Sequence, residues 1–319
     1  MKGVGNNMAN DLMFIPATYE GYTFEPDYKQ IFQNKWTFNI AHDELIKMRN
    51  NGYLTDRDMN IVKFIFKYRF ATAEMMFRYL GEESKIENVQ SRLDRLVKSR
   101  ILNKFMLSRM EGDTLSPDAL HIYCLDVGGR TLLTHYSNED TTNWYTTENM
   151  KGSEVISRDL VTANFYIKLM QTCPEKIKYF KLNPQFRIGR KTVIASFEMG
   201  LKEGEQMKYF IGEVVRDYDF PALFRDRLTN LESILCTKAW KKYYYDVDVP
   251  PVLFIFAEHD KNALEVSQMI SGTTEIKSFR TTTDQRLQKD LAEPGVFLKY
   301  DEEKQVLQGV RTSIFQPSK

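Results

Sequence analysis

One stretch determines the fold of the N-terminal half: Lys85-Ile-Glu-Asn-Val-Gln-Ser-Arg-Leu-Asp-Arg-Leu-Val-Lys-Ser-Arg100. Its apolar residues have helical spacing and share one face, namely Ile86, Val89, Leu93, Leu96 and Val97. The opposite face, at about 100° per residue, carries Asn88, Ser91, Arg95 and Lys98, flanked by Lys85 and Arg92. A helix with one apolar side and one side of amide, hydroxyl and guanidinium groups suits a DNA major groove.

Two helices are predicted before this stretch. The first begins after Leu54, because Thr55 is a good N-cap and Asp58 favours the positive end of a helix. The second runs over 73–80 and ends at Gly81, a residue that readily adopts the left-handed conformation of a helix C-terminus.

A pair of strands and a closing helix are predicted after it. Residues 101–107 and 119–125 are expected as the two strands, joined by a long loop over 108–118. Asp126 is then expected to cap a helix over 127–135. Three helices followed by a two-stranded wing are the elements of a winged helix-turn-helix.

Four segments carry a family resemblance: Leu54-Thr55-x-Arg57-Asp58, Arg69-Phe70-Ala71-Thr72-x-x-x-Met76, Arg92-Leu93-x-Arg95-Leu96-Val97-x-x-x-Ile101-Leu102 and Tyr123-x-Leu125-x-x-x-Gly129-Arg130. In these segments the chain resembles the replication-relaxation family of Gram-positive bacteria, their plasmids and their integrative elements. The resemblance implies a winged-helix domain followed by a domain related to restriction-endonuclease folds.

Four regions are expected along the chain. An aromatic-rich arm over 1–50, with a short helix at 27–34, should pack on the body of the protein or on a second subunit. The winged helix-turn-helix should occupy 51–136, and the Thr- and Asn-rich stretch 137–152 should be a linker. Residues 153–319 should form the nuclease-like domain, which gives a two-domain chain of α+β or α/β class.

The second domain shows the element order of a PD-(D/E)xK nuclease core. The predicted helices cover 157–172, 222–235 and 262–270. The predicted strands cover 186–188, 193–199, 209–215 and the buried apolar run 251–257, with 276–280 and 296–300 as edge strands.

The catalytic residues of such a nuclease are incomplete. The chemistry requires an Asp on the second core strand and Glu-x-Lys on the third, so that carboxylates hold Mg²⁺ beside the lysine. Glu213 fits the glutamate, but Val215 takes the place of the lysine and the aspartate position falls near Ile194. Glu198 could pair with Glu213 across the hairpin. We therefore expect no catalytic residues, no metal and no cofactor, with Mg²⁺ bound by these two glutamates only if the alternative of a nicking nuclease holds.

Other residues with chemical potential give weaker signals. The three cysteines, at 124, 173 and 236, are far apart and expected to be buried thiols. The four histidines show no ligand spacing, and His259 is expected in a turn. Asp159 is expected as a helix N-cap. The tyrosines of 243–245 could stack bases, although packing is the preferred interpretation.

Composition excludes a few classes of protein. The net charge is only +1, from 44 basic and 43 acidic side chains, so any binding to DNA must come from local clusters of charge. No apolar run approaches the roughly 18 residues that span a bilayer. The first ten residues contain no apolar core, so no signal peptide is expected and the cytoplasm is the expected location.

The sequence thus predicts a sequence-specific protein that binds double-stranded DNA and controls replication, transfer or transcription of a plasmid or mobile element. The candidate DNA-binding residues are Lys85, Asn88, Ser91, Arg92, Arg95, Lys98, Arg100, Lys104 and Arg109. A homodimer is expected, with replication or transfer proteins as further partners and no membrane association. The alternatives are a metal-dependent nicking nuclease and a non-catalytic adaptor that binds proteins.

Overall fold

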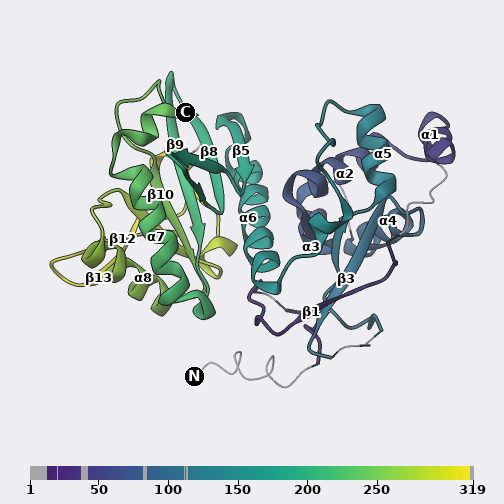
Figure 1. The fold of residues 1–319 in the computed structure, drawn as a ribbon, viewed down its shortest axis with the longest axis horizontal. Helices are drawn as coiled ribbons and strands as arrows, with labels where there is room; N and C mark the ends of the chain where they lie inside the picture. Colours follow the sequence, from purple (N-terminus) through teal and green to yellow (C-terminus); the bar gives the residue numbers. More distant parts are fainter. Residues whose placement is uncertain are drawn as a thin grey trace. The chain divides into compact units, whose positions relative to one another are not determined.

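The computed structural model describes residues 13–19, 21–36, 42–81, 85–110, 112 and 114–316. The chain divides into two compact units, Met1–Ala163 and Asn164–Lys319, each with helices and sheet (Figure 1). Both are mixed structures, so the expected α+β class is confirmed at that level. No helix within the described ranges is both long enough and apolar enough to cross a membrane.

The first unit is built on a four-stranded antiparallel sheet. Its strands are β1 (Lys29–Phe32), β2 (Phe70–Thr72), β3 (Leu102–Ser108) and β4 (Ile122–Leu125), in the order β1-β3-β4-β2. Its α-helices are α1 (His42–Asn50), α2 (Asp56–Tyr68), α3 (Ala73–Leu80), α4 (Ile86–Lys98) and α5 (Val127–Tyr136). The helices predicted after Leu54 and over 73–80, 85–100 and 127–135 correspond to α2, α3, α4 and α5. The two predicted strands correspond to β3 and β4, although β4 begins only at Ile122.

Local capping explains where these helices begin and end. Thr55 caps α2 and forms a capping box with Asp58, in which each side chain bonds the backbone N–H of the other residue. Gly81 ends α3 with a φ of +65°, which glycine adopts without a steric cost. Asp126 caps α5 by accepting from the N–H of Val127 at 2.8 Å.

The described residues of the N-terminal arm pack on the body of the first unit, which is one of the two expected alternatives. The helix expected at 27–34 is wrong, because Lys29–Phe32 instead pairs with the free edge of β3 as strand β1. The ring of Phe32 lies 5.1 Å from the ring of Phe105 on β3, and Phe24 is fully buried. Sheet pairing and aromatic burial therefore outweigh any local helical preference.

The stretch 137–152, expected to be a linker between two domains, instead belongs to the first unit. Asn149 is buried, and its side chain donates to the backbone oxygen of Leu125 at 2.8 Å. The backbone oxygen of Asn149 accepts from the side chain of Gln30 at 2.8 Å. These bonds hold the segment on the body, and the division between the units falls inside helix α6 (Ser153–Thr172).

The second unit contains a seven-stranded sheet of order β13-β12-β11-β10-β9-β8-β5. Its strands are β5 (Ile177–Leu182), β8 (Phe197–Glu203), β9 (Gln206–Val214), β10 (Val252–Ala257), β11 (Phe279–Thr283), β12 (Phe297–Asp301) and β13 (Val306–Val310). Strands β9, β10 and β11 are parallel neighbours, and the other neighbouring pairs are antiparallel. A separate hairpin joins β6 (Gln185–Ile188) to β7 (Lys191–Ile194).

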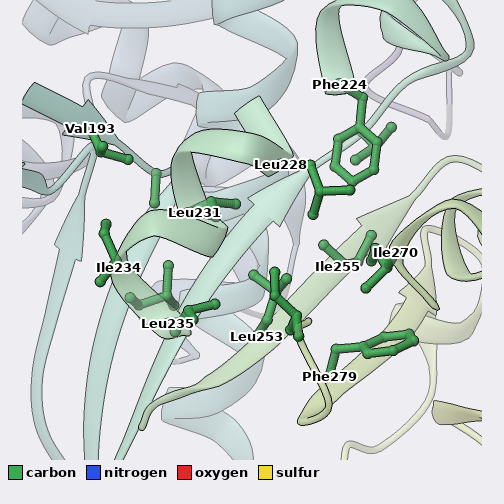
Figure 2. Packing of buried hydrophobic residues seen from close by; sticks show 14 of the residues in the cluster. Val193, Phe224, Leu228, Leu231, Ile234, Leu235, Leu253, Ile255, Ile270 and Phe279 are labelled. Atoms are coloured by element: carbon green, nitrogen blue, oxygen red, sulfur yellow. The ribbon is translucent and has the colours of Figure 1, made fainter. Parts of the chain in front are cut away.

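The core of this unit lies between the sheet and the helices α7 (Ala222–Leu235) and α8 (Asp260–Thr273). Leu228 and Leu231 of α7 and Ile270 of α8 pack over Leu253 and Ile255 of β10 (Figure 2). On the opposite face, Phe165 of α6 packs against Phe256 with ring centroids 4.6 Å apart. Strand β10 is thus buried on both faces, as its continuous apolar run predicts.

Several predicted strands differ from the observed ones. The stretch expected as one strand over 193–199 is the end of β7 and the start of β8, so Ile194 lies outside the main sheet. The expected edge strands correspond to β11 and β12, which are interior, while β13 and β5 form the edges. Lysines interrupt β5, and β11 ends in buried threonines, so neither strand has a clear apolar pattern.

Candidate nucleic-acid interface

Helix α4 presents one exposed polar stripe. Its apolar side is buried at Val89, Leu93, Leu96 and Val97, whereas Ile86 is only half-buried. The opposite side is exposed at Lys85, Asn88, Ser91, Arg95 and Lys98, which we call the α4 stripe. The helix therefore has the two-sided character that its sequence predicts.

Two arginines of α4 are anchored to the start of α2. Asp58 is 1% exposed and accepts from Arg92 Nη1 at 2.9 Å. Arg95 Nη2 lies 3.1 Å from both carboxylate oxygens of Asp58. The Arg92 side chain is 22% exposed, but that of Arg95 is 51% exposed, so Arg95 keeps part of its guanidinium open to a ligand.

These contacts stabilise the ionised form of the Asp58 carboxyl. Burial raises the pKa of the carboxyl, but the hydrogen bonds from Thr55 and the Arg92 guanidinium together outweigh it and leave the pKa below its usual value. Asp58 thus serves as the capping-box residue of α2 and as the anion that orients two side chains of α4.

Three other candidate DNA-binding residues already have partners within the first unit. Arg100 Nε lies 2.7 Å from the buried carboxylate of Asp126, and Lys104 Nζ lies 2.8 Å from Asp94. Arg109 pairs with Asp27 at 3.3 Å. Their side chains are 23%, 12% and 29% exposed, so stabilisation of the unit accounts for them better than contact with DNA does.

Sequence reasoning missed these carboxylate partners. Asp58 and Asp126 are both recognisable as helix caps. When a capping carboxylate is buried, its other oxygen also needs a hydrogen-bond donor, and an arginine nearby can supply one. Asp27 and Asp94 gave no such signal, because each pairs with a residue outside its own element.

In the second unit, the negative charge of Glu213 is balanced by an arginine, Arg227. Its Oε1 lies 2.7 Å from Arg227 Nε, and its Oε2 accepts from the N–H of Ser196 at 3.2 Å. Arg227 Nη1 also lies 3.0 Å from buried Asp219. The pKa of Arg227 is lowered by burial but raised more by Glu213 and Asp219 together, so it remains a cation where a nuclease would hold a metal.

Glu198 has a different set of partners. It accepts from Tyr179 Oη at 2.7 Å, and Lys181 Nζ lies 3.7 Å from it. Burial, followed by the hydrogen bond to Glu198, raises the pKa of Tyr179, so this phenol remains a donor. Glu198 pairs in register with Ile211, so it lies on the same face of the sheet as Glu213. The two carboxylates nevertheless bind separate groups.

The other positions of the nuclease motif carry no ligand. Val215 is buried, and Ile194, 53% exposed, lies on the β6–β7 hairpin instead of the second core strand. Arg216 is fully buried and pairs with Asp284 at 3.0 Å. Among the residues that the structure describes, no group of three or more His, Cys, Asp or Glu side chains could hold a metal ion.

Several minor expectations need correction. Asp159 is not an N-cap: it lies inside α6, is buried, and accepts from Arg69 Nη1 at 2.5 Å. His259 is the N-cap of α8, where its Nδ1 accepts from the N–H of Asn262. Cys236 is exposed, unlike the other two cysteines.

No protein-family model matches the chain, and no curated protein matches it. Among solved structures, the chain is similar to protein VC1899 from Vibrio cholerae, with 10% sequence identity and a TM-score of 0.28. The similarity covers 82% of this chain and 56% of that protein, so this chain spans little more than half of its length. At this TM-score the likeness shows neither fold nor function.

Proposed function

We propose that the first unit is a winged helix-turn-helix that binds double-stranded DNA through the α4 stripe. The element order α2-β2-α3-α4-β3-β4 supports this, as does the placement of β4 between β2 and β3 in the sheet. Helix α4 occupies the position of the recognition helix, and its N-terminal part would lie nearest the base edges.

The α4 stripe itself is the observation that carries the proposal. Its five exposed residues offer cations, an amide and a hydroxyl on a helix whose other side is buried at Val89, Leu93, Leu96 and Val97. An arginine can bond guanine through two donors, and Asn88 is suited to adenine. Asp58 restricts the rotamers of Arg95, which lowers the entropy that the side chain loses when it binds a base.

The second unit, in this proposal, has the nuclease-like order of helix, three strands, helix and strand but does not cleave DNA. The support is chemical: Arg227 supplies the positive charge at Glu213 and Asp219. The unit would then serve for assembly or for contact with replication or transfer proteins. The resemblance to the replication-relaxation family favours control of replication, transfer or transcription of a mobile element, and winged-helix regulators commonly act as two-fold dimers.

The direct test is enrichment of bound fragments from the DNA that encodes the chain, followed by fluorescence anisotropy on the enriched duplex. The variant Lys85→Gln/Ser91→Ala/Lys98→Gln changes exposed stripe residues and should lose about 10-fold or more in affinity. The matched variant Lys35→Gln/Lys47→Gln has the same change in charge on other exposed lysines of the first unit. Equal affinities for the two variants would refute the role of the stripe, and binding without salt dependence would favour the adaptor alternative.

A further inference from the structure

A second concentration of positive charge lies in the other unit. It combines the β6–β7 hairpin with the short helix η4 (Lys238–Lys242). We call it the basic hairpin surface, and its residues are Arg187, Arg190, Lys191, Lys238, Lys241 and Lys242. All six are exposed, and neither 185–194 nor 237–245 contains an acidic residue.

The two segments are held together by packing and hydrogen bonds. Tyr243, just after η4, accepts from the N–H of Arg187 at 2.5 Å and donates to the oxygen of the same residue at 3.0 Å. Its ring also meets Phe186 edge-on, with centroids 5.2 Å apart. Val193 of the hairpin faces Leu231 and other apolar residues of α7 (Figure 2). The hairpin is therefore fixed beside η4, with its three basic residues exposed to solvent.

The charges on this surface are almost uncompensated. Among the described residues, the ion pair that involves one of these six cations joins Lys241 to Asp248 at 3.8 Å, and Asp248 is fully exposed. Without these six cations the chain would have a net charge of −5 in place of +1. Like charges on one surface repel one another and raise the free energy of the folded state. A polyanion would remove that repulsion on binding.

We propose that the basic hairpin surface contacts the phosphate backbone of double-stranded DNA. The inference builds on the proposed function, since it gives the same partner a second point of attachment on the second unit. Phosphate contacts fix position without reading sequence. The arrangement of three flexible lysines beside two arginines and a lysine on a hairpin suits this role, because each cation can neutralise one phosphate and release counterions.

The test uses the full chain and the salt dependence of DNA affinity. The variant Arg187→Gln/Arg190→Gln/Lys191→Gln should lower the slope of log K against log salt by about 0.9 for each lost contact, or roughly 3 in total. Its preference for the enriched duplex over a scrambled duplex should be unchanged. The control Lys261→Gln/Lys299→Gln/Lys304→Gln removes three exposed charges elsewhere in the second unit and should keep the parent slope. Circular dichroism would verify that both variants fold.

The outcomes separate this inference from the proposed function. A hairpin variant with the parent slope overturns the inference, even if the α4 variant loses specificity. A reduced slope in the hairpin variant supports it, even if the α4 variant binds normally and the reading role of α4 fails. A parent protein that binds no duplex at low salt overturns both. A control variant whose slope falls as much as that of the hairpin variant also overturns the inference, because the effect would then come from net charge alone.

Discussion

Arg95 Nη2 lies 3.1 Å from each carboxylate oxygen of Asp58, although the two residues come from different helices, α4 and α2. The same carboxylate closes the capping box of α2. One buried anion therefore fixes the start of one helix and the orientation of the next. A substitution at Asp58 should therefore change both the stability of the first unit and the geometry of the α4 stripe.

Replacing Asp58 with Asn should lower the free energy of unfolding by about 2–3 kcal/mol, because the cap weakens and Arg92 and Arg95 lose their counter-charge. Urea denaturation would measure the loss. The control is Asp56→Asn, whose exposed side chain pairs with Arg49 and should change stability by less than about 0.5 kcal/mol. Equal losses for the two variants would show that Asp58 is not the anchor.

The stabilisation by Asp58 should depend on pH. Its pKa in the folded state is lowered, so the folded protein holds this proton less tightly than the unfolded chain does. The contribution is complete above the unfolded pKa of about 3.9 and is lost as pH falls through the folded pKa. The difference in stability between the parent and Asp58→Asn should therefore be constant near neutrality and shrink below about pH 4. A difference that grew at low pH would reverse the assigned direction.

Two substitutions on α4 should affect DNA binding differently. Arg95→Ala should relax the preference at one base pair, at a cost of about 1–3 kcal/mol in discrimination. Lys98→Ala should weaken binding to all sequences alike and lower the salt slope by about one unit. Anisotropy titrations on a set of single-base variants of the bound site would distinguish the two patterns. Identical profiles for the two variants would argue against base contact by Arg95.

Supercoiled plasmid should stay intact when the purified protein is incubated with Mg²⁺ or Mn²⁺, since Arg227 supplies the positive charge at Glu213. Agarose gels over several hours would detect single nicks. Nicking by the parent that disappears in Glu213→Gln would contradict the expectation and restore the nuclease alternative. Nicking that persists in Glu213→Gln would indicate a contaminant.

Tyr243→Phe should loosen the β6–β7 hairpin. The substitution removes the hydroxyl that bonds both backbone groups of Arg187, at a cost of about 1 kcal/mol. Amide hydrogen exchange over 185–194 should become faster, while exchange in β10 should not change. Tyr245→Phe is the matched control, because Tyr245 is 88% exposed. Similar exchange in both variants would mean that the hydroxyl of Tyr243 does not hold the hairpin.

Helices α2 to α5 could be predicted because their signals are local, whereas α1 was not predicted. Thr55, Asp126 and Gly81 are cap residues, and the apolar residues of α4 repeat with helical spacing. Strand β1 could not be predicted, since its conformation depends on the edge of β3, which lies far along the chain. The same limit explains β5 and β13, whose patterns carry little apolar periodicity.

The candidate site divides in the same way. The exposure of Asn88, Ser91 and Lys98 follows from helical spacing alone. The pairing of Lys104 with Asp94 does not, because it joins β3 to α4, and the basic hairpin surface depends on Tyr243 bonding Arg187 across 56 positions of sequence. Charge counts along the chain therefore overestimate how many cations of the first unit are open to a ligand.

Strand β1 also determines how the protein can be shortened. It supplies hydrogen-bond partners to the outer edge of β3, with Lys29 opposite Ser108 and Phe32 opposite Phe105. A fragment that began at Gly52, between α1 and α2, would leave that edge with bare N–H and C=O groups beside the uncovered ring of Phe105. Such edges recruit strands from neighbouring molecules, so the fragment would be prone to self-association. A soluble, independent first unit must keep the residues that precede α1.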